Sequence, residues 1–257
     1  MDFFQVIVLA IVEGFTEFLP ISSTAHLILA SRILNIAESD FLKSFTIAIQ
    51  LGAILAVVVL YSKRCFRDWE INKRVVVAFI PTAIIGAIFY KIIKGVFFES
   101  LALILFSLFS GGVLLIVFEI FYKKKKNQPV ALKDLPYWKV MLIGVAQALA
   151  AVPGVSRAAA TVVGGMLLGV SRKEIVEFSF FLAVPTMAAA TAFDLSKSAG
   201  DFSLDQFHLV AAGFIASFVF AILGVKFILS YIQKNSFIGF GIYRIFLAIF
   251  LFVFFFI

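Results

Sequence analysis

The chain has 257 residues, of which 63% are hydrophobic and only 14% are charged. A soluble domain is about half apolar and about a quarter charged, so this composition excludes an ordinary soluble protein and predicts a single membrane domain over residues 1–257. The net charge of +7 comes from Lys and Arg gathered between apolar segments, which indicates membrane orientation and no nucleic-acid binding. Cys65 is the only cysteine, so no intrachain disulfide can form.

Residues 2–34 are apolar but contain the polar stretch EGFTEFLPISSTAH (13–26), with Pro20 near its middle. Proline disrupts a helix interior, so we expect two half-length helices that form a re-entrant hairpin with its tip near Pro20 and Ile21. The absence of basic residues before Arg32 favours a hairpin that enters from the outer side. The alternative is one tilted helix over the same residues, with its N-terminus inside.

Six segments are long and apolar enough to cross the bilayer, for which a helix needs about 20 residues. They cover residues 41–61, 75–93, 99–122, 175–195, 206–231 and 236–257. Short cytoplasmic loops are rich in Lys and Arg, which places the loop 61–74 and the lysine run 123–126 inside. The lysine run would also contact anionic lipid headgroups.

Residues 137–170 contain a second interruption, AAVPGVSRAAAT (150–161). Basic residues flank both ends, namely the lysine run before it and Arg172 and Lys173 after it. Both ends are therefore expected inside, which predicts a second re-entrant hairpin that enters from the cytoplasm. The predicted fold is an all-α polytopic membrane protein with six full transmembrane helices and two re-entrant hairpins.

The two interruptions can be aligned at an offset of 134 residues, which pairs Glu13 with Gln147 and Ser22 with Ser156. One hairpin enters from each side, and long spans follow both. This plan predicts an inverted-topology repeat with halves over about 1–122 and 137–257, in which broken helices form a site near the bilayer midplane.

Irregular backbone at membrane depth survives only where it lines a polar cavity, so both interruptions should face one pocket. Ser22 or Ser23 would cap the helix after the first break, and Ser156 the helix after the second. Helix starts attract anions, and the donor fork of Arg157 suits phosphate. A site for a phosphate group is predicted, with a carboxylate as the less demanding alternative.

Acidic and proton-transferring side chains add chemistry to this predicted site. Glu13 and Glu17 are spaced i, i+4 on one helix face, so at low dielectric either one is protonated or a cation lies between them. A divalent cation, Mg²⁺ or Ca²⁺, would bind both carboxylates and phosphate oxygens. His26 shares a helix face with Ser23, which suggests a nucleophile with a general base or acid. Ser22 and Thr24 could instead serve only as caps.

The two motifs resemble the signatures of the undecaprenyl-diphosphatase, or bacitracin-resistance, family. The first nearly completes the pattern E-G-x-T-E-F-L-P-x-S-S-T-x-H, and the second matches P-G-x-S-R-S-x-x-T except that Ala158 replaces the usual Ser. The segments FTIAIQLGAILAVVV (45–59) and AVPTM (183–187) look like further family blocks, so the resemblance runs from near residue 5 to about 190.

The resemblance implies a multi-pass hydrolase of the bacterial inner membrane that converts undecaprenyl diphosphate to undecaprenyl phosphate and inorganic phosphate. This reaction recycles the lipid carrier of peptidoglycan synthesis, depends on a divalent cation and takes place in a site open to the periplasm. The predicted roles are catalysis for Ser23, His26, Glu17 and Glu13, phosphate binding for Arg157, Ser156, Thr161 and Ser22, and metal binding for Glu13 and Glu17. The nucleophile stays open between Ser23, His26 and water.

The main rival is a polyprenyl-phosphate transporter or flippase with the same pocket, because opposed hairpins are transporter architecture. The proton-transferring groups of the first motif favour the enzyme. An ion-coupled symporter is less favoured, since Arg157 would compete with the cation. The glycine-rich faces around Gly164 and Gly165 serve close helix packing and would also allow a homodimer.

Overall fold

The structure, a computed structural model, describes residues 1–92, 100–122, 129–197 and 206–257. Within these ranges the chain is helical, and its only strand-like pairing is an isolated bridge between Val130 and Val170. Six helices there are long and apolar enough to cross a membrane: α3 (Asp40–Leu60), α5 (Trp69–Ile92), α6 (Leu101–Tyr122), α9 (Arg172–Lys197), α10 (Phe207–Lys234) and α11 (Ile238–Phe256). The predicted all-α fold and its six spans are confirmed. Residues 93 and 99, at the ends of two predicted spans, and the lysine run 123–126 lie outside the described residues.

Two of these helices begin earlier than the hydropathy pattern predicts. α5 starts at Trp69 rather than at residue 75, because the Asp68 carboxylate accepts a hydrogen bond from the Ile71 backbone N–H at 3.1 Å and caps the helix. Ser171 caps α9 in the same way by accepting from the Glu174 N–H at 3.3 Å. Polar first turns extend both helices into the basic loops, and a further short helix, α4 (Ser62–Arg67), occupies the loop before α5.

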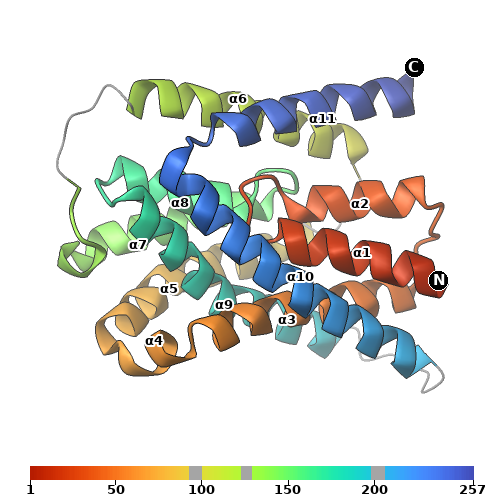
Figure 1. Cartoon of the computed structure of the whole chain (residues 1–257), viewed down its shortest axis with the longest axis horizontal. Coiled ribbons are helices and arrows are strands. Elements are labelled where there is room, and N and C mark those ends of the chain that lie inside the picture. The colour runs from red at the N-terminus through yellow and green to blue at the C-terminus, as the bar shows by residue number, and fades with distance from the viewer. Residues whose placement is uncertain (93–99, 123–128, 198–205) are drawn as a thin grey trace.

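Both predicted interruptions divide the chain into pairs of short helices. The first pair is α1 (Phe3–Thr16) and α2 (Ser23–Ile33), and the second is α7 (Tyr137–Ala148) and α8 (Arg157–Leu167). The members of each pair lie side by side, with α1 and α2 at the right of Figure 1 and α7 and α8 at the left. Residues 2–34 are therefore not one continuous tilted helix.

The basic loops come together at one end of the molecule. Arg64 of α4 forms an ion pair with Glu177 of α9, and Arg172 donates to the carbonyl of Asn235, between α10 and α11, at 2.9 Å. Arg74 of α5 donates to the carbonyl of Leu132 at 2.9 Å, within the 3-10 turn Leu132–Asp134. Both termini lie at the opposite end (Figure 1). The loops that the charge pattern assigns to one side thus share one end of the fold.

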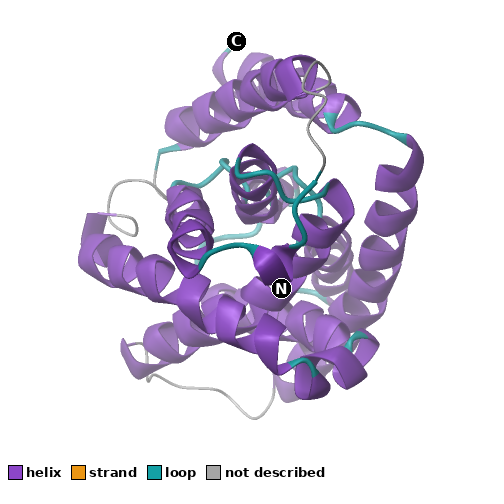
Figure 2. Ribbon diagram, turned by 90° about the vertical axis from the view of Figure 1, so that its left-hand side faces the viewer, coloured by secondary structure: helices purple, strands orange, loops and turns teal. Residues whose placement is uncertain are grey.

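α1 lies in the interior, where α3 and α10 pack against it. Gly14 permits this close approach, because a Cβ there would lie 2.3 Å from the carbonyl oxygen of Ser217 on α10. The Ser217 hydroxyl in turn donates to the carbonyl of Ile49 on α3 at 2.7 Å. Figure 2, which looks along the long axis, shows the long helices arranged around a centre that holds the short helices and their turns.

α6 and α11 form a separate layer along the top of Figures 1 and 2. This layer joins α2 through two small apolar clusters, made of Ala25, Ile104, Leu108 and Ala248, and of Leu29, Leu101, Leu105 and Leu251. At the basic end, Arg172 forms an ion pair of 2.8 Å with the buried Glu119 of α6. The α6–α11 layer is thus attached to the remaining helices both along α2 and at the basic end of the fold.

The predicted glycine face on α8 packs inside the chain. A Cβ at Gly164 would lie 2.6 Å from the Cβ of Ala146 on α7, and one at Gly165 would lie 2.2 Å from the Ile175 side chain on α9. Close packing of α8 against α7 and α9 at these glycines is therefore confirmed.

Candidate active site

The two helix breaks meet, although 134 residues of sequence separate their matched positions. The Ser156 hydroxyl lies 3.5 Å from the carbonyl oxygen of Leu19, and Arg157 Nη2 donates to Glu17 Oε1 at 3.1 Å. One cluster of polar side chains thus draws on both motifs, as the sequence predicts.

The matched serines Ser22 and Ser156 share an unusual backbone conformation. Their φ angles are +72° and +77°, in the left-handed region that non-glycine residues seldom adopt, and each directly precedes a short helix. Ser156 accepts from the Ala159 N–H at 3.2 Å and so caps α8 as predicted. The Ser22 side chain makes no such capping bond, and its carbonyl oxygen accepts from the His26 N–H at 3.2 Å.

Arg157 is the first residue of α8, and its guanidinium lies between the two motifs. Nη1 donates to the carbonyl of Ser179 at 2.8 Å, and Nη2 contacts Glu17. The buried Nε has no hydrogen-bond partner among the described residues. Protein contacts to Nη1 and Nη2 thus fix the direction of the guanidinium.

The two glutamates differ in their surroundings, although both are buried. Glu17 accepts from Arg157 on Oε1 and from the Ser23 hydroxyl on Oε2. Glu13, one helical turn earlier, is fully buried, and neither of its carboxylate oxygens has a hydrogen-bond partner among the described residues. A buried carboxylate without a partner is costly unless it is protonated or binds a cation.

The Ser23 hydroxyl is paired with Glu17 and not with His26, which differs from the expected nucleophile–histidine pair. His26 Nδ1 lies 2.7 Å from the Ser22 carbonyl oxygen, and Nε2 lies 2.8 Å from the hydroxyl oxygen of Tyr243 on α11. The break between α1 and α2 turns the Ser23 side chain back toward the end of α1, where Glu17 lies. The structure therefore gives Ser23 a carboxylate as its proton acceptor.

The family model described as bacitracin resistance protein BacA matches residues 6–250. The chain belongs to the BacA family. This match extends past the resemblance expected from the motifs, which ended near residue 190, and includes α10 and most of α11.

Relatives named undecaprenyl-diphosphatase match the BacA-family chain over nearly its whole length. The protein of Aquifex aeolicus is 50% identical over 249 residues, which are 97% of each chain. That of Sulfurihydrogenibium sp. is 49% identical over 249 residues, covering 97% of this chain and 98% of the relative. The Thermus thermophilus protein is 44% identical over 247 residues, covering 95% and 94%.

Thr161, a predicted phosphate ligand, has its hydroxyl in hydrogen-bonding contact with other groups of the protein. It is fully buried, and its hydroxyl contacts the Arg157 carbonyl at 2.8 Å and Gln147 Oε1 at 3.2 Å. Gln147 Nε2 donates to the hydroxyls of Thr82 and Thr186 at 3.2 and 3.0 Å. Gln147, which the repeat matches to Glu13, thus has hydrogen-bond partners on three other helices of the BacA-family fold.

Thr161→Val distinguishes a structural role of Thr161 from phosphate binding. Valine conserves volume but leaves Gln147 Oε1 without this partner, so we expect the free energy of unfolding to fall by about 1–2 kcal/mol. Because the hydroxyl already contacts Gln147 and the Arg157 carbonyl, KM for undecaprenyl diphosphate, the substrate that the relatives' name indicates, should change less than about twofold. Thermal unfolding and steady-state kinetics of the detergent-purified variant test this. A large rise in KM without loss of stability would instead assign Thr161 to the substrate.

Arg244 contacts both helix breaks, although it lies outside the two motifs. It lies in α11 with its side chain fully buried. Its guanidinium donates to five backbone carbonyls: Pro20 at 3.3 Å, Val155 at 3.0 Å and Gly154 at 2.7 Å in the two breaks, and Ser107 at 3.2 Å and Leu108 at 3.3 Å in α6. An arginine inside an apolar span is costly and therefore marks a candidate functional position. On this ground the sequence alone points to Arg244.

Space for this arginine depends on Gly111 of α6. A Cβ at Gly111 would lie 2.1 Å from Arg244 Nη2. The Arg244 guanidinium of the last helix therefore holds the two helix breaks and α6 together. Arg244 thus satisfies the carbonyl of Pro20 in the first break and those of Gly154 and Val155 in the second.

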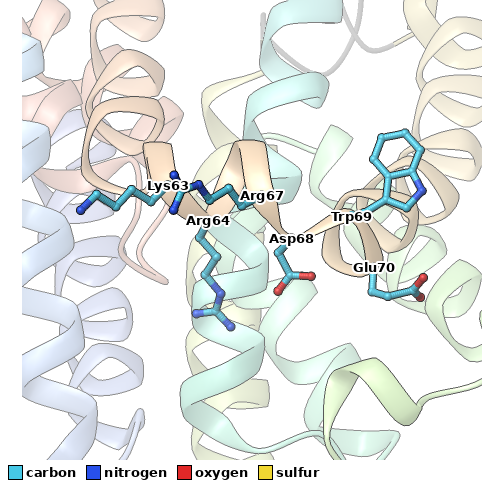
Figure 3. A pocket seen from close by; sticks show the side chains of 6 residues that line it. All are labelled: Lys63, Arg64, Arg67, Asp68, Trp69 and Glu70. Carbon is cyan, nitrogen blue, oxygen red and sulfur yellow. The ribbon is translucent and has the colours of Figure 1, made fainter.

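An open hollow of about 510 Å³ lies elsewhere, around α4 and the start of α5 (Figure 3). Its lining residues are Lys63, Arg64, Arg67, Asp68, Trp69 and Glu70. No predicted site residue lines it, and charges of both signs surround it. It belongs to the basic end of the fold and not to the candidate site.

Proposed function

We propose that this membrane protein hydrolyses undecaprenyl diphosphate to undecaprenyl phosphate and inorganic phosphate, and so recycles the carrier lipid of peptidoglycan synthesis. The observation that carries the proposal is the group formed by Glu17, Ser23 and Arg157 where the two helix breaks meet. These three residues supply a hydroxyl, a proton acceptor and an anion ligand. The near full-length similarity to proteins named undecaprenyl-diphosphatase supports the same reaction, and the family description supports a contribution to bacitracin resistance.

The two helix pairs would be re-entrant hairpins that enter the membrane from opposite faces, as halves of an inverted-topology repeat. The matched positive φ angles of Ser22 and Ser156 and the location of the pairs toward opposite ends of the fold support this. With the basic loops inside, the pair α1–α2 opens to the outer face. The site would then face the periplasm from the inner membrane, and the prenyl tail would remain in lipid.

The substrate's phosphates would bind at the starts of α2 and α8, beside Arg157. Backbone N–H groups at a helix start carry a partial positive charge and bind phosphate readily. The Arg157 guanidinium adds a full charge, and its contacts with Ser179 and Glu17 fix its direction in advance. Ser156 and Ser22 border the same two helix starts. These groups would stabilise the negative charge of the transferring phosphoryl group.

Glu13 and Glu17 fit a hard divalent cation such as Mg²⁺ or Ca²⁺. Both carboxylates lie on one face of α1, and the Glu13 oxygens have no protein partner in the described part of the chain. No third carboxylate, histidine or cysteine of that part joins them, so phosphate oxygens or water would complete the shell, as Mg²⁺ commonly requires. When bound, the cation would neutralise charge on the phosphates.

Ser23 is the nucleophile that the hydrogen bonding favours. Its hydroxyl would pass its proton to Glu17 as Oγ forms a bond to the terminal phosphorus. The bond from that phosphorus to the bridging oxygen breaks, and undecaprenyl phosphate leaves with the electron pair. Water then hydrolyses the phosphoserine, which releases inorganic phosphate and restores the serine. Direct attack by His26 or by activated water is the alternative.

Phosphate release from undecaprenyl diphosphate by detergent-purified protein tests the function. We expect release in the presence of Mg²⁺ or Ca²⁺, loss of it with a chelator, and recovery when the cation is restored. The opposed helix pairs also suit a polyprenyl-phosphate transporter. Movement of labelled undecaprenyl phosphate across liposomes without phosphate release would favour that function and contradict hydrolysis.

Ser23→Ala is expected to lower phosphate release by about 10³-fold or more, because no hydroxyl remains to attack. The alanine fits the same buried position, so the variant should stay folded. Ser31→Ala, further along α2, is the matched control and should keep full activity. Substantial hydrolysis by the Ser23 variant would assign the attack to His26 or water.

A further inference from the structure

The last helix reaches the site through Tyr243, which contacts His26 of α2. The Tyr243 hydroxyl oxygen lies 2.8 Å from His26 Nε2, and the two rings stack with centroids 5.6 Å apart and an interplanar angle of 11°. The neighbouring Arg244 contacts the carbonyl of Pro20 in the same break. Two adjacent residues of α11 thus fix the break and the histidine that follows it.

The hydrogen bonds define the tautomer of His26. Nδ1 lies 2.7 Å from the Ser22 carbonyl oxygen, and a carbonyl oxygen can only accept, so Nδ1 carries the hydrogen. Nε2 of the neutral ring is then an acceptor, and the Tyr243 hydroxyl donates to it. If the ring gains a proton, Nε2–H can donate to the same hydroxyl oxygen, so Tyr243 serves both protonation states.

The contacts around Tyr243 indicate a role beyond packing α11 against α2. α2 and α11 also meet through apolar residues such as Leu29 and Leu251 and through the Arg32 guanidinium, 6.0 Å from the Phe255 ring centre. The Tyr243–His26 pair adds a hydrogen bond to these contacts. Tyr243 is 41% exposed, so the pair lies at the edge of the site, where a headgroup entering beside α11 would reach it. An apolar contact would suffice to hold the helices together.

We propose that Tyr243 is a positioning residue of the active site, which holds the His26 ring with Nδ1 protonated and Nε2 directed to the site's exposed edge. The inference deepens the proposed diphosphatase function and rests on it. Tyr243 acts through His26, by fixing its tautomer and orientation, and the family motifs do not contain it. Tyr243 would act on His26 as the third residue of a hydrolase triad acts on its histidine, by orienting the residue that transfers the proton.

The tautomer can be observed directly because the chain contains only two histidines, His26 and His208. In a His208→Gln background, protein with ¹⁵N-labelled histidine rings gives signals from His26 alone. We expect a protonated Nδ1 and a hydrogen-bonded, unprotonated Nε2. Tyr243→Phe should shift the Nε2 signal toward the unbonded position while both proteins remain folded. Identical spectra in the two proteins would overturn the inference.

Kinetics of Tyr243→Phe provide the second readout. Phenylalanine keeps the stacked ring and removes only the hydroxyl, so we expect kcat for undecaprenyl diphosphate to fall about tenfold with KM changed less than about twofold. Tyr231→Phe, whose ring packs on Phe240 of α11 with centroids 4.7 Å apart, is the control and should match the parent protein.

The outcomes separate this inference from the proposed function. If the parent and the Tyr231→Phe control hydrolyse the substrate and Tyr243→Phe does so equally fast, the positioning role is wrong and the diphosphatase function stands. If neither the parent nor the control releases phosphate, the proposed function fails. A slower Tyr243→Phe enzyme with unchanged histidine signals would also overturn positioning through His26.

Discussion

Arg157→Lys is expected to lower phosphate release from undecaprenyl diphosphate by about 10²–10³-fold while the protein remains folded. Arg157 contacts the Ser179 carbonyl and Glu17 through two different nitrogens, which fixes the plane of its guanidinium. A lysine ammonium is a single point charge and cannot hold these directions at once. The defect should therefore be chemical, and kcat should fall more than KM rises.

The measurement is steady-state phosphate release together with thermal unfolding in the same detergent. Arg67→Lys, on the open hollow at the basic end, makes the same chemical change far from the helix breaks and should have no effect. Near-normal turnover by Arg157→Lys would show that a charge alone suffices at this position. A loss of folding equal to the loss of activity would mean that Arg157 supports the fold instead.

Arg244→Met is expected to destabilise the protein by about 3–5 kcal/mol, because each of the five donated hydrogen bonds contributes roughly 1 kcal/mol. Methionine retains an apolar side chain of similar length but leaves carbonyls of both breaks without a donor. The two halves of the site would then separate, and phosphate release should fall even in the fraction that remains folded.

Thermal unfolding followed by size-exclusion chromatography checks the stability, and phosphate release per folded molecule checks the site. Arg32→Met is the control, since Arg32 is an exposed arginine of α2 whose guanidinium lies 6.0 Å from the Phe255 ring centre. Equal stability of the two variants would contradict the joining role of Arg244. Arg244→Lys should recover only part of the stability, because an ammonium has three donors for five carbonyls.

A hydrolase and a lipid transporter would use this architecture differently. A transporter needs the anion ligand Arg157 and the helix starts, but a Ser23 hydroxyl donating to a buried Glu17 adds little to binding. The serine–carboxylate pair is what a phosphoryl-transfer reaction requires. Loss of phosphate release in Ser23→Ala together with retained substrate binding would therefore support the enzyme.

Local sequence determines where the helices, the helix breaks and the polar motif residues of this protein lie. Hydropathy depends on composition within a window, so six spans were predictable and all six appear as helices. Proline removes a backbone donor and glycine admits a positive φ, so the breaks at 17–22 and near Pro153 were predictable where polar residues accompany them, whereas Pro81 and Pro185 lie inside the continuous helices α5 and α9. The sequence predicts Glu17, Ser23 and Arg157 as site residues because polar groups at membrane depth are costly without a function, and the three contact one another through Glu17.

Only the tertiary structure decides how these residues pair. Ser23 contacts Glu17 rather than His26, Thr161 contacts Gln147, and Arg244 joins two breaks from a helix at the far end of the chain. The physical reason is that hydropathy and helix-breaking act over a few residues, whereas a hydrogen bond depends on the rotation and height of helices that pack from distant parts of the sequence. Spacing along the chain places a side chain on a helix face, and the packing of that helix decides which partner the face meets.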